Sequence, residues 1–305
     1  MEKDNFYIMA SAALLFFLVL LPSGKIDKKI SKNLAADVSA AIERPREPHI
    51  EAKSAYAYDL NADRGVFEKE KGLIWPLASV AKIVSALVLL DNIGLKEEIE
   101  VSKNAILTPE PSSLKAGEHF LASDLLAMAM VESSNDAITA LVEAAAKKNG
   151  VPQNESEAWF INLMNLKANS LGAFTMRFNN PTGLDILDIK TGLPAQAGAV
   201  GSAEDLMSIM KATIDSELWQ FGEITDVQSK EGFIHPLHPT NLLKSEVTGL
   251  IGGKTGFTDL AGGNLLVIIQ YPYPSGHLYG IVVLGSSEDG RFEDVKKILE
   301  YIKAL

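Results

Sequence analysis

Apolar and polar positions alternate with different periods along this chain, and each period predicts a type of element. Residues 55–58 alternate with period two, residues 61–65 form turns readily, and residues 66–67 resume the pattern, which is typical of a β-hairpin. Apolar runs at 264–271 and 278–284 flank a turn rich in proline. They predict a second hairpin close to the C-terminus.

The middle of the chain shows helical patterns instead. The run 80–90 is apolar on nearly every side, which predicts a buried helix, and helical patterns also cover 136–148 and 203–214. A last helix is expected at 293–305, with one apolar face. Strands at both ends of a helical middle imply an α/β (α+β) fold, in which helices cover an antiparallel sheet built from distant segments.

Composition limits the classes of function. The 305 residues are 47% hydrophobic, which is enough to bury one large core or two packed lobes. A net charge of −11 without a basic stripe argues against nucleic acid as a partner. Cysteine is absent, and His235 and His238 lack a fitting third ligand, so they are interpreted as part of a surface loop. No metal or other cofactor is expected.

The N-terminus carries a targeting pattern. Residues 6–21 contain no charged side chain and precede Pro22, which is typical of a signal peptide or a short membrane anchor. Ser23 and Gly24 offer only a weak cleavage site, so for residues 1–24 an uncleaved anchor is favoured over a cleaved signal. Residues 25–49 are charged and alanine-rich, and we expect them to form a linker.

Three short motifs follow one another in an order that predicts acyl-transfer chemistry. Residues 79–82 match S-x-x-K, residues 133–135 match S-x-N, and residues 254–256 read K-T-G. Serine is a poor nucleophile at neutral pH, and a lysine three residues later on a helix lies within reach of its hydroxyl. The set predicts an active-site serine that forms an acyl intermediate on an amide substrate without any histidine.

Each motif has further matches, so context must decide between them. S-x-x-K recurs at 112–115, in a proline-rich loop, and at 208–211, in an ordinary amphipathic helix. S-x-N recurs at 31–33 and 102–104 in charged surroundings, and K-T-G recurs at 190–192, where a proline soon follows. Proline cannot continue a central strand. The first set is preferred because it combines a buried helix, a helix junction and a glycine-rich strand.

With these motifs and their surroundings, the chain resembles the serine-type D-alanyl-D-alanine carboxypeptidases, the low-molecular-mass penicillin-binding proteins. The resemblance runs from about Ile50 onward and includes the segments 178–181 and 253–258. It implies a β-lactamase/transpeptidase-like fold, an antiparallel sheet flanked by helices plus a helical lobe, with 50–305 as the catalytic domain. Thr182 stands where histidine is frequent, a departure that could tune substrate preference.

The resemblance and the side-chain chemistry together imply the catalytic roles. Ser79 would attack the carbonyl of the penultimate D-alanine, and Lys82 would take its proton. Ser133 would relay a proton to the departing amine. Asn135 would hold the substrate amide and orient Lys82.

The resemblance also implies how substrate would be bound. Lys254 and the hydroxyl of Thr255 would bind the free terminal carboxylate. Gly256 lies where a glycine lets a substrate backbone approach a strand closely. The backbone N–H groups of Phe257 and Ser79 would hold the oxyanion.

The expected function is removal of the terminal D-alanine from peptidoglycan stem peptides outside the cytoplasm, by an enzyme anchored in the membrane and inhibited covalently by β-lactams. A D,D-endopeptidase that cuts cross-links has the same motifs, so that alternative stays open. A β-lactamase of the commonest class needs a glutamate to activate water, and no carboxylate lies between Glu157 and Asp185. A catalytically silent wall-binding protein would normally have lost one of the motifs.

Overall fold

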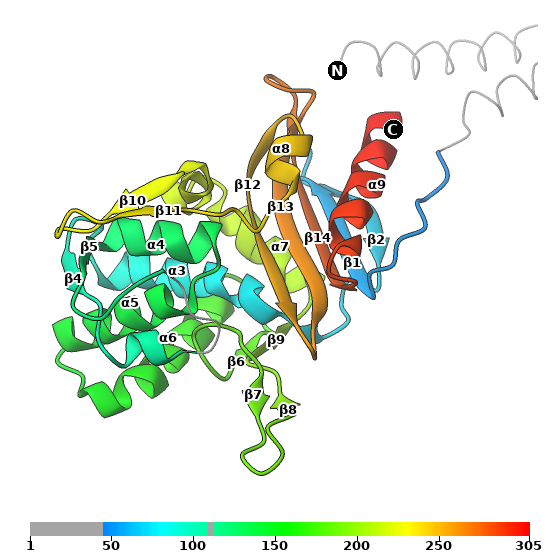
Figure 1. Cartoon of the computed structure of the whole chain (residues 1–305). Helices are drawn as coiled ribbons and strands as arrows, with labels where there is room; N and C mark the ends of the chain where they lie inside the picture. Colours follow the sequence, from blue (N-terminus) through cyan, green and yellow to red (C-terminus); the bar gives the residue numbers. More distant parts are fainter. Residues whose placement is uncertain (1–44, 109–112) are drawn as a thin grey trace, which may run out of the picture. The chain divides into compact units, whose positions relative to one another are not determined.

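The central sheet joins segments from both ends of the chain (Figure 1). In this computed structural model, which describes residues 45–108 and 113–305, the strand order is β12-β13-β14-β1-β2 and all neighbours are antiparallel. The strands are β1 (Ser54–Asp59), β2 (Arg64–Lys69), β12 (Leu250–Thr258), β13 (Gly262–Tyr271) and β14 (His277–Ser286). Both predicted hairpins and the antiparallel sheet are confirmed.

Side-chain alternation divides this sheet between two hydrophobic cores. On β1, Tyr56 and Tyr58 join a core shared with the helical lobe, whereas Ala55 and Ala57 join a second core beneath the C-terminal helix α9 (Gly290–Ala304). Every residue of β1 is buried, because helices cover both faces of the sheet. Only β12 and β2 are edge strands, and β12 carries the K-T-G motif.

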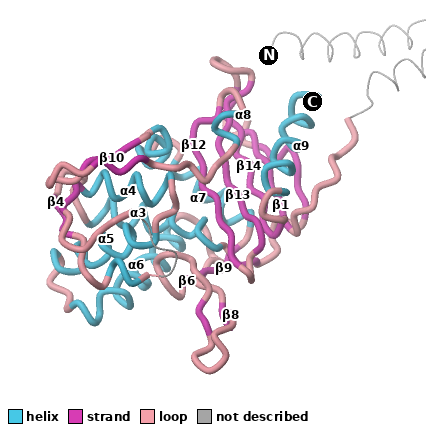
Figure 2. Tube along the Cα trace, viewed as in Figure 1, coloured by secondary structure: helices cyan, strands magenta, loops and turns pink. Residues whose placement is uncertain are grey.

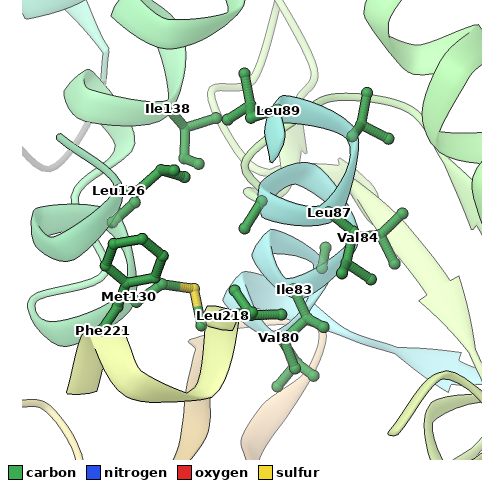
Figure 3. Packing of buried hydrophobic residues seen from close by; sticks show 14 of the residues in the cluster. Val80, Ile83, Val84, Leu87, Leu89, Leu126, Met130, Ile138, Leu218 and Phe221 are labelled. Carbon is green, nitrogen blue, oxygen red and sulfur yellow. The ribbon is translucent and has the colours of Figure 1, made fainter. Parts of the chain in front are cut away.

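The helical lobe is built around one central helix. Figure 3 shows Val80, Ile83 and Leu87 among the buried side chains of this segment, with Leu126 and Ile138 from neighbouring helices. The central helix is buried from Lys82 to Leu89, as its all-round apolar pattern predicts. The helices are α3 (Lys82–Asn92), α4 (Ala122–Val131), α5 (Asn135–Lys148), α6 (Ser156–Ser170), α7 (Ala203–Thr213) and α8 (Leu243–Glu246), with 3-10 turns η1 (Ala78–Ala81), η2 (Ala105–Leu107), η3 (Gln153–Glu155) and η4 (Glu217–Glu223).

Small sheets of two or three short strands lie outside the central sheet (Figure 2). In Figure 1 the β7–β8 hairpin projects away from the rest of the fold. The short strands are β3 (Trp75–Pro76), β6 (Arg177–Phe178) and β9 (Ala199–Gly201) in one sheet, and the pairs β4 (Glu98–Glu100) with β5 (His119–Leu121), β7 (Ile186–Leu187) with β8 (Pro194–Gln196), and β10 (Asp226–Gln228) with β11 (Ile234–Pro236).

The interpretation of His235 as part of a surface loop was wrong. His235 is buried on β11, with Nδ1 2.9 Å from Ser113 Oγ and Nε2 3.2 Å from Glu118 Oε1. A buried imidazole needs partners for both nitrogens, and these two side chains supply them. Its surroundings therefore account for it as a structural histidine.

The predicted anchor at 1–24 and most of the linker at 25–49 lie outside the described residues. Residues 47–305 form one compact unit. Within the described part of the chain, no helix has both the length and the apolar character needed to cross a membrane.

Candidate active site

Ser79 lies at the meeting point of the helical lobe and the sheet. It belongs to the 3-10 turn η1, immediately before α3, and is only 8% exposed. The preceding residue, Ala78, has φ of +48°, a left-handed conformation that costs a non-glycine residue energy. Close packing holds this turn, since a Cβ on Gly183 would lie 2.0 Å from the carbonyl oxygen of Ala78. The backbone turn that carries Ser79 is thereby packed tightly against the segment at Gly183.

Lys82 contacts the Ser79 hydroxyl directly. Its side chain is fully buried, and Nζ lies 2.7 Å from Ser79 Oγ. Nζ also donates to the carbonyl oxygen of Thr182 at 2.9 Å. The predicted pairing of Ser79 with Lys82 is therefore present in the structure, with a second acceptor that orients the amine.

The Thr182 carbonyl is held by a side-chain turn. Asn180 Oδ1 accepts from the backbone N–H groups of Thr182, at 3.2 Å, and Gly183, at 2.7 Å. Such Asx turns fix a loop without regular secondary structure. Lys82 therefore uses a backbone atom at position 182, which is why a threonine can replace histidine there without loss of this contact. The sequence marked Thr182 as a departure from the family pattern, but it did not indicate that the carbonyl oxygen of this residue binds Lys82.

The second motif occupies the junction between α4 and α5, as predicted. Ser133 has φ of +66°, and Ser134 caps α5 by accepting from the backbone N–H of Ala137 at 3.1 Å. Asn135 begins α5 and is 1% exposed. Helix capping thus explains the middle serine, and the reversal at Ser133 sets the direction in which the chain enters α5.

The third motif lies on the edge strand β12. Lys254 is 1% exposed, and its Nζ donates to the carbonyl oxygen of Thr255 at 2.9 Å. Thr255 Oγ1 lies 2.6 Å from Thr240 Oγ1, a hydroxyl partner that sequence reasoning missed. Burial, reinforced by the nearby charges of Lys82 and Arg291, holds the pKa of Lys254 well below its usual range.

Gly256 explains how the strand reaches the serine. A Cβ at this position would lie 2.8 Å from the Leu77 carbonyl oxygen and 3.1 Å from the Ser79 backbone nitrogen. Only glycine permits so close an approach. The next residue on β12, Phe257, is exposed.

Arg291 is a further cation of this region that sequence reasoning missed. It lies in the first turn of α9 and is buried, and its Nη1 donates to the Gly256 carbonyl oxygen at 2.8 Å. Burial lowers its pKa from the usual value. The sequence did show a charged residue at the start of a helix with an apolar face. It could not show the partner of that residue, because the partner is a backbone carbonyl far away in the sequence.

Among the described residues, the rival motifs at Ser208 and Lys190 do not form comparable sites. Ser208 Oγ donates to the Glu204 carbonyl oxygen, while Lys211 bonds Asp63 and the Tyr58 hydroxyl. Lys190 lies in the exposed turn of the β7–β8 hairpin. Ser112, in the remaining S-x-x-K match, lies outside the described residues.

The comparisons with known proteins agree with this geometry. A family model described as D-alanyl-D-alanine carboxypeptidase matches residues 41–270. The chain belongs to this family. It is 28% identical over 235 residues to a D-alanyl-D-alanine endopeptidase of Escherichia coli, covering 75% of this chain and 70% of that protein. It is 27% identical to the E. coli D-alanyl-D-alanine carboxypeptidase DacA, covering 89% of this chain and 66% of that protein.

Solved structures confirm the predicted fold class. Penicillin-binding protein D2 from Listeria monocytogenes, in its cefotaxime-bound form, matches with a TM-score of 0.67 and 24% identity. The match covers 84% of this chain and 99% of that one. The resemblance drawn from the motifs and the penicillin-binding-protein fold are both borne out.

Proposed function

We propose that this chain is a serine-type carboxypeptidase that removes the terminal D-alanine from peptidoglycan stem peptides. One observation carries the proposal: in a member of the D-alanyl-D-alanine carboxypeptidase family, a buried lysine amine lies 2.7 Å from the hydroxyl of Ser79. An amine at this distance is placed to take the hydroxyl proton as the serine attacks. The pair therefore fits an activated nucleophile and its base.

Acylation uses the first two motifs. Ser79 Oγ attacks the carbonyl carbon of the penultimate D-alanine, and Lys82 Nζ takes the hydroxyl proton. The tetrahedral intermediate then breaks its C–N bond, and Ser133 relays a proton to the departing amine of D-alanine. Asn135, at the buried start of α5, holds the substrate amide and orients Lys82.

Stabilisation of the oxyanion falls to two backbone N–H groups, those of Ser79 and Phe257. The close approach of Gly256 to the Ser79 nitrogen supports this assignment, because it brings the two segments together. Fixed donors of this kind stabilise the charge that develops on the carbonyl oxygen, typically by about 3 kcal/mol each.

Recognition of the free C-terminus falls to Lys254 and Thr255. Lys254 is buried on the edge strand and lies near two further cations, so its site attracts a carboxylate. A bound carboxylate supplies the counter-charge that this buried amine needs. The Thr255 hydroxyl, adjacent to that of Thr240, adds a neutral donor.

The direct test is release of D-alanine by the purified, detergent-solubilised full chain. A peptide ending in D-Ala-D-Ala should lose one D-alanine, as measured by mass spectrometry, and Ser79→Ala should abolish the loss. An intact peptide in the presence of protein that fluorescent penicillin still acylates would count against the carboxypeptidase.

An endopeptidase remains a second candidate, and the names of similar proteins favour keeping it. Three relatives at 25–28% identity are named D-alanyl-D-alanine endopeptidases. The bond attacked has the same chemistry, but the leaving amine belongs to another stem peptide rather than to D-alanine. Cross-linked muropeptides, incubated in parallel, distinguish the two: conversion to monomers faster than D-alanine release would reverse our assignment.

Covalent inhibition by β-lactams follows from the same serine. The matched Listeria protein is described in cefotaxime-bound and ampicillin-bound forms. No carboxylate lies between Glu157 and Asp185, so no residue of that interval can activate water on a penicilloyl ester. We expect the ester to be long-lived, and rapid repeated hydrolysis of penicillin would favour a β-lactamase.

The peptidoglycan substrate requires action outside the cytoplasm. We propose that residues 1–24 hold the protein at the membrane and that residues 25–49 link them to the catalytic domain at 50–305. Fractionation tests this placement, with the full-length chain expected in membranes. Free extracellular protein that begins near Lys25 would indicate a cleaved signal peptide instead.

A further inference from the structure

Two threonine hydroxyls form a pair beside the K-T-G strand. Thr255 is buried on β12, and its Oγ1 lies 2.6 Å from Oγ1 of Thr240, in the segment that precedes α8. Thr240 also contacts the end of α4, where the Val131 carbonyl oxygen lies 3.2 Å from Thr240 Oγ1 and 3.0 Å from the Thr240 backbone nitrogen. Thr240 therefore connects the third motif to the helix that leads into the second.

The number of hydroxyl protons limits which of these bonds can exist together. Each hydroxyl donates one proton and accepts through two lone pairs. If Thr240 donates to the Val131 carbonyl oxygen, the contact between the hydroxyls must use the Thr255 proton, and none is left for a ligand. If Thr240 donates to Thr255 Oγ1 instead, the Thr255 proton is available to a third group. Only this second arrangement makes Thr255 a donor to substrate.

Exchange between the two arrangements leaves the Val131 carbonyl oxygen paired. This oxygen accepts from the Thr240 backbone N–H in both of them, so the loss of the hydroxyl bond does not orphan a buried acceptor. A carboxylate only accepts hydrogen bonds, and bonds to a charged acceptor are stronger than bonds between neutral groups. A carboxylate bound at Thr255 therefore favours the second arrangement.

We propose that Thr240 is a positioning residue for recognition of the substrate C-terminus. Its hydroxyl donates to Thr255 Oγ1 and thereby directs the Thr255 proton to the terminal carboxylate. The inference rests on the proposed function, in which Lys254 and Thr255 bind that carboxylate. A donated hydrogen bond also polarises the hydroxyl that accepts it, which makes Thr255 a stronger donor. Thr240 thus acts on substrate through Thr255.

Thr240→Val tests this role in the detergent-solubilised full chain, because it replaces the hydroxyl with a methyl group of similar size. We expect kcat/KM for release of D-alanine from a peptide ending in D-Ala-D-Ala to fall about three- to tenfold, the usual effect of one hydrogen bond. Thr240→Ser keeps the hydroxyl and should stay within about twofold of the wild type. Thr213→Val is the matched control, since it removes a buried hydroxyl that donates within α7, and kcat/KM should be unchanged.

A double-mutant cycle with Thr255→Val separates this role from a purely structural one. If Thr240 acts through the Thr255 hydroxyl, Thr240→Val should change kcat/KM by less than about twofold once residue 255 lacks that hydroxyl. If Thr240 only holds its segment against α4, its effect should persist in that background. Should Thr240→Val fail to fold, as thermal melting would show, Thr240→Ala removes the same hydroxyl and takes its place in the cycle.

Acylation by benzylpenicillin, which carries a carboxylate beside its reactive amide, provides a second readout of the same cycle. If the wild-type enzyme releases no D-alanine, the proposed carboxypeptidase fails, and the second-order rate of acylation then decides the role of Thr240. A rate within about twofold of the wild type in Thr240→Val, a loss that Thr240→Ser shares, or a loss that survives Thr255→Val would each overturn the inference.

Discussion

Two K-T-G sequences occur in this chain, and they have different physical functions. At 190–192 the backbone N–H groups of Lys190 and Thr191 donate to Asp188 Oδ1, and Gly192 has φ of +67° with open space around it. That glycine is there to make a turn. At 254–256 the glycine lies in a strand and is there because the Ser79 segment packs against it.

The two described S-x-x-K sequences differ in the same way. Around Ser79, Lys82 is buried, and its Nζ bonds both the serine hydroxyl and the Thr182 carbonyl oxygen. Lys211, by contrast, is part of an exposed network with Asp63 and Tyr58, while Ser208 donates to its own helix. The same residue types three positions apart therefore place a buried amine against a serine hydroxyl in one case and a partly exposed amine against a carboxylate in the other.

Substitution of the serines should give the largest difference between the two S-x-x-K sequences. We expect Ser79→Ala to abolish covalent labelling by fluorescent penicillin, because no other described serine has a buried lysine amine at hydrogen-bond distance. Ser208→Ala should leave labelling unchanged. Gel fluorescence measures both, and a label that persists on Ser79→Ala would place the nucleophile elsewhere.

Substitution of the two K-T-G lysines should give the next largest difference, in kcat/KM. Lys254→Ala should lower kcat/KM for a peptide with a free C-terminus by about 10²- to 10³-fold, the usual cost of removing one partner of a buried charge pair. Lys190→Ala, in the exposed turn, should remain within about twofold of the wild type. The opposite result would show that the K-T-G at 190–192 anchors the carboxylate.

Substitution of the two K-T-G glycines distinguishes their roles: Gly256 allows β12 to approach the Ser79 segment, and Gly192 forms a turn. Gly256→Ala places a methyl group 2.8 Å from a backbone oxygen and forces the strand away from Ser79, so we expect kcat/KM to fall about 10²-fold. Gly192→Ala strains a positive φ in open space and should cost about 1 kcal/mol of stability with little effect on turnover. Thermal melting beside steady-state kinetics distinguishes the two.

The sequence predicted most where periodicity is strong and local. Alternation predicted the first hairpin, and two apolar runs around a proline-rich turn predicted the second. An all-round apolar run predicted α3, although the α-helix itself begins only at Lys82 and Ser79 lies in the preceding 3-10 turn. The order of the motifs identified Ser79 among rival serines because each motif carried a different structural context.

Contacts to backbone atoms of distant residues could not be predicted. The Thr182 carbonyl reaches Lys82 across 100 positions, and Arg291 reaches the Gly256 carbonyl across 35. A carbonyl oxygen is present at every position, so no residue type marks the one that is used. His235 was missed for a related reason, because its partners Ser113 and Glu118 come from a distant loop.

The pKa of Lys254 predicts how substrate binding depends on pH. Its amine has a lowered pKa when the site is empty, and a bound carboxylate favours the charged form, so binding takes up a proton. Affinity of the peptide for Ser79→Ala protein should fall as pH rises above that pKa, by at most about tenfold per pH unit. Lys254→Ala should remove this proton uptake, and Lys190→Ala should retain it, as calorimetry in buffers of different ionisation enthalpy would measure.

The smallest effect concerns the lysine of the rival S-x-x-K. Lys211 and Asp63 have side chains 40% and 74% exposed, so their ion pair is largely screened by water. The hydrogen bond with Asp63 raises the pKa of Lys211, and the same bond lowers that of Asp63. The pair thus stabilises the protein across neutral pH, and this contribution disappears as pH rises through the raised lysine pKa or falls through the lowered aspartate pKa.

Lys211→Met should lower the melting temperature by at most about 3 °C at neutral pH and leave penicillin labelling of Ser79 intact. Loss of labelling in this variant would show that Lys211 takes part in the site, and that the difference between the two motifs is not one of burial.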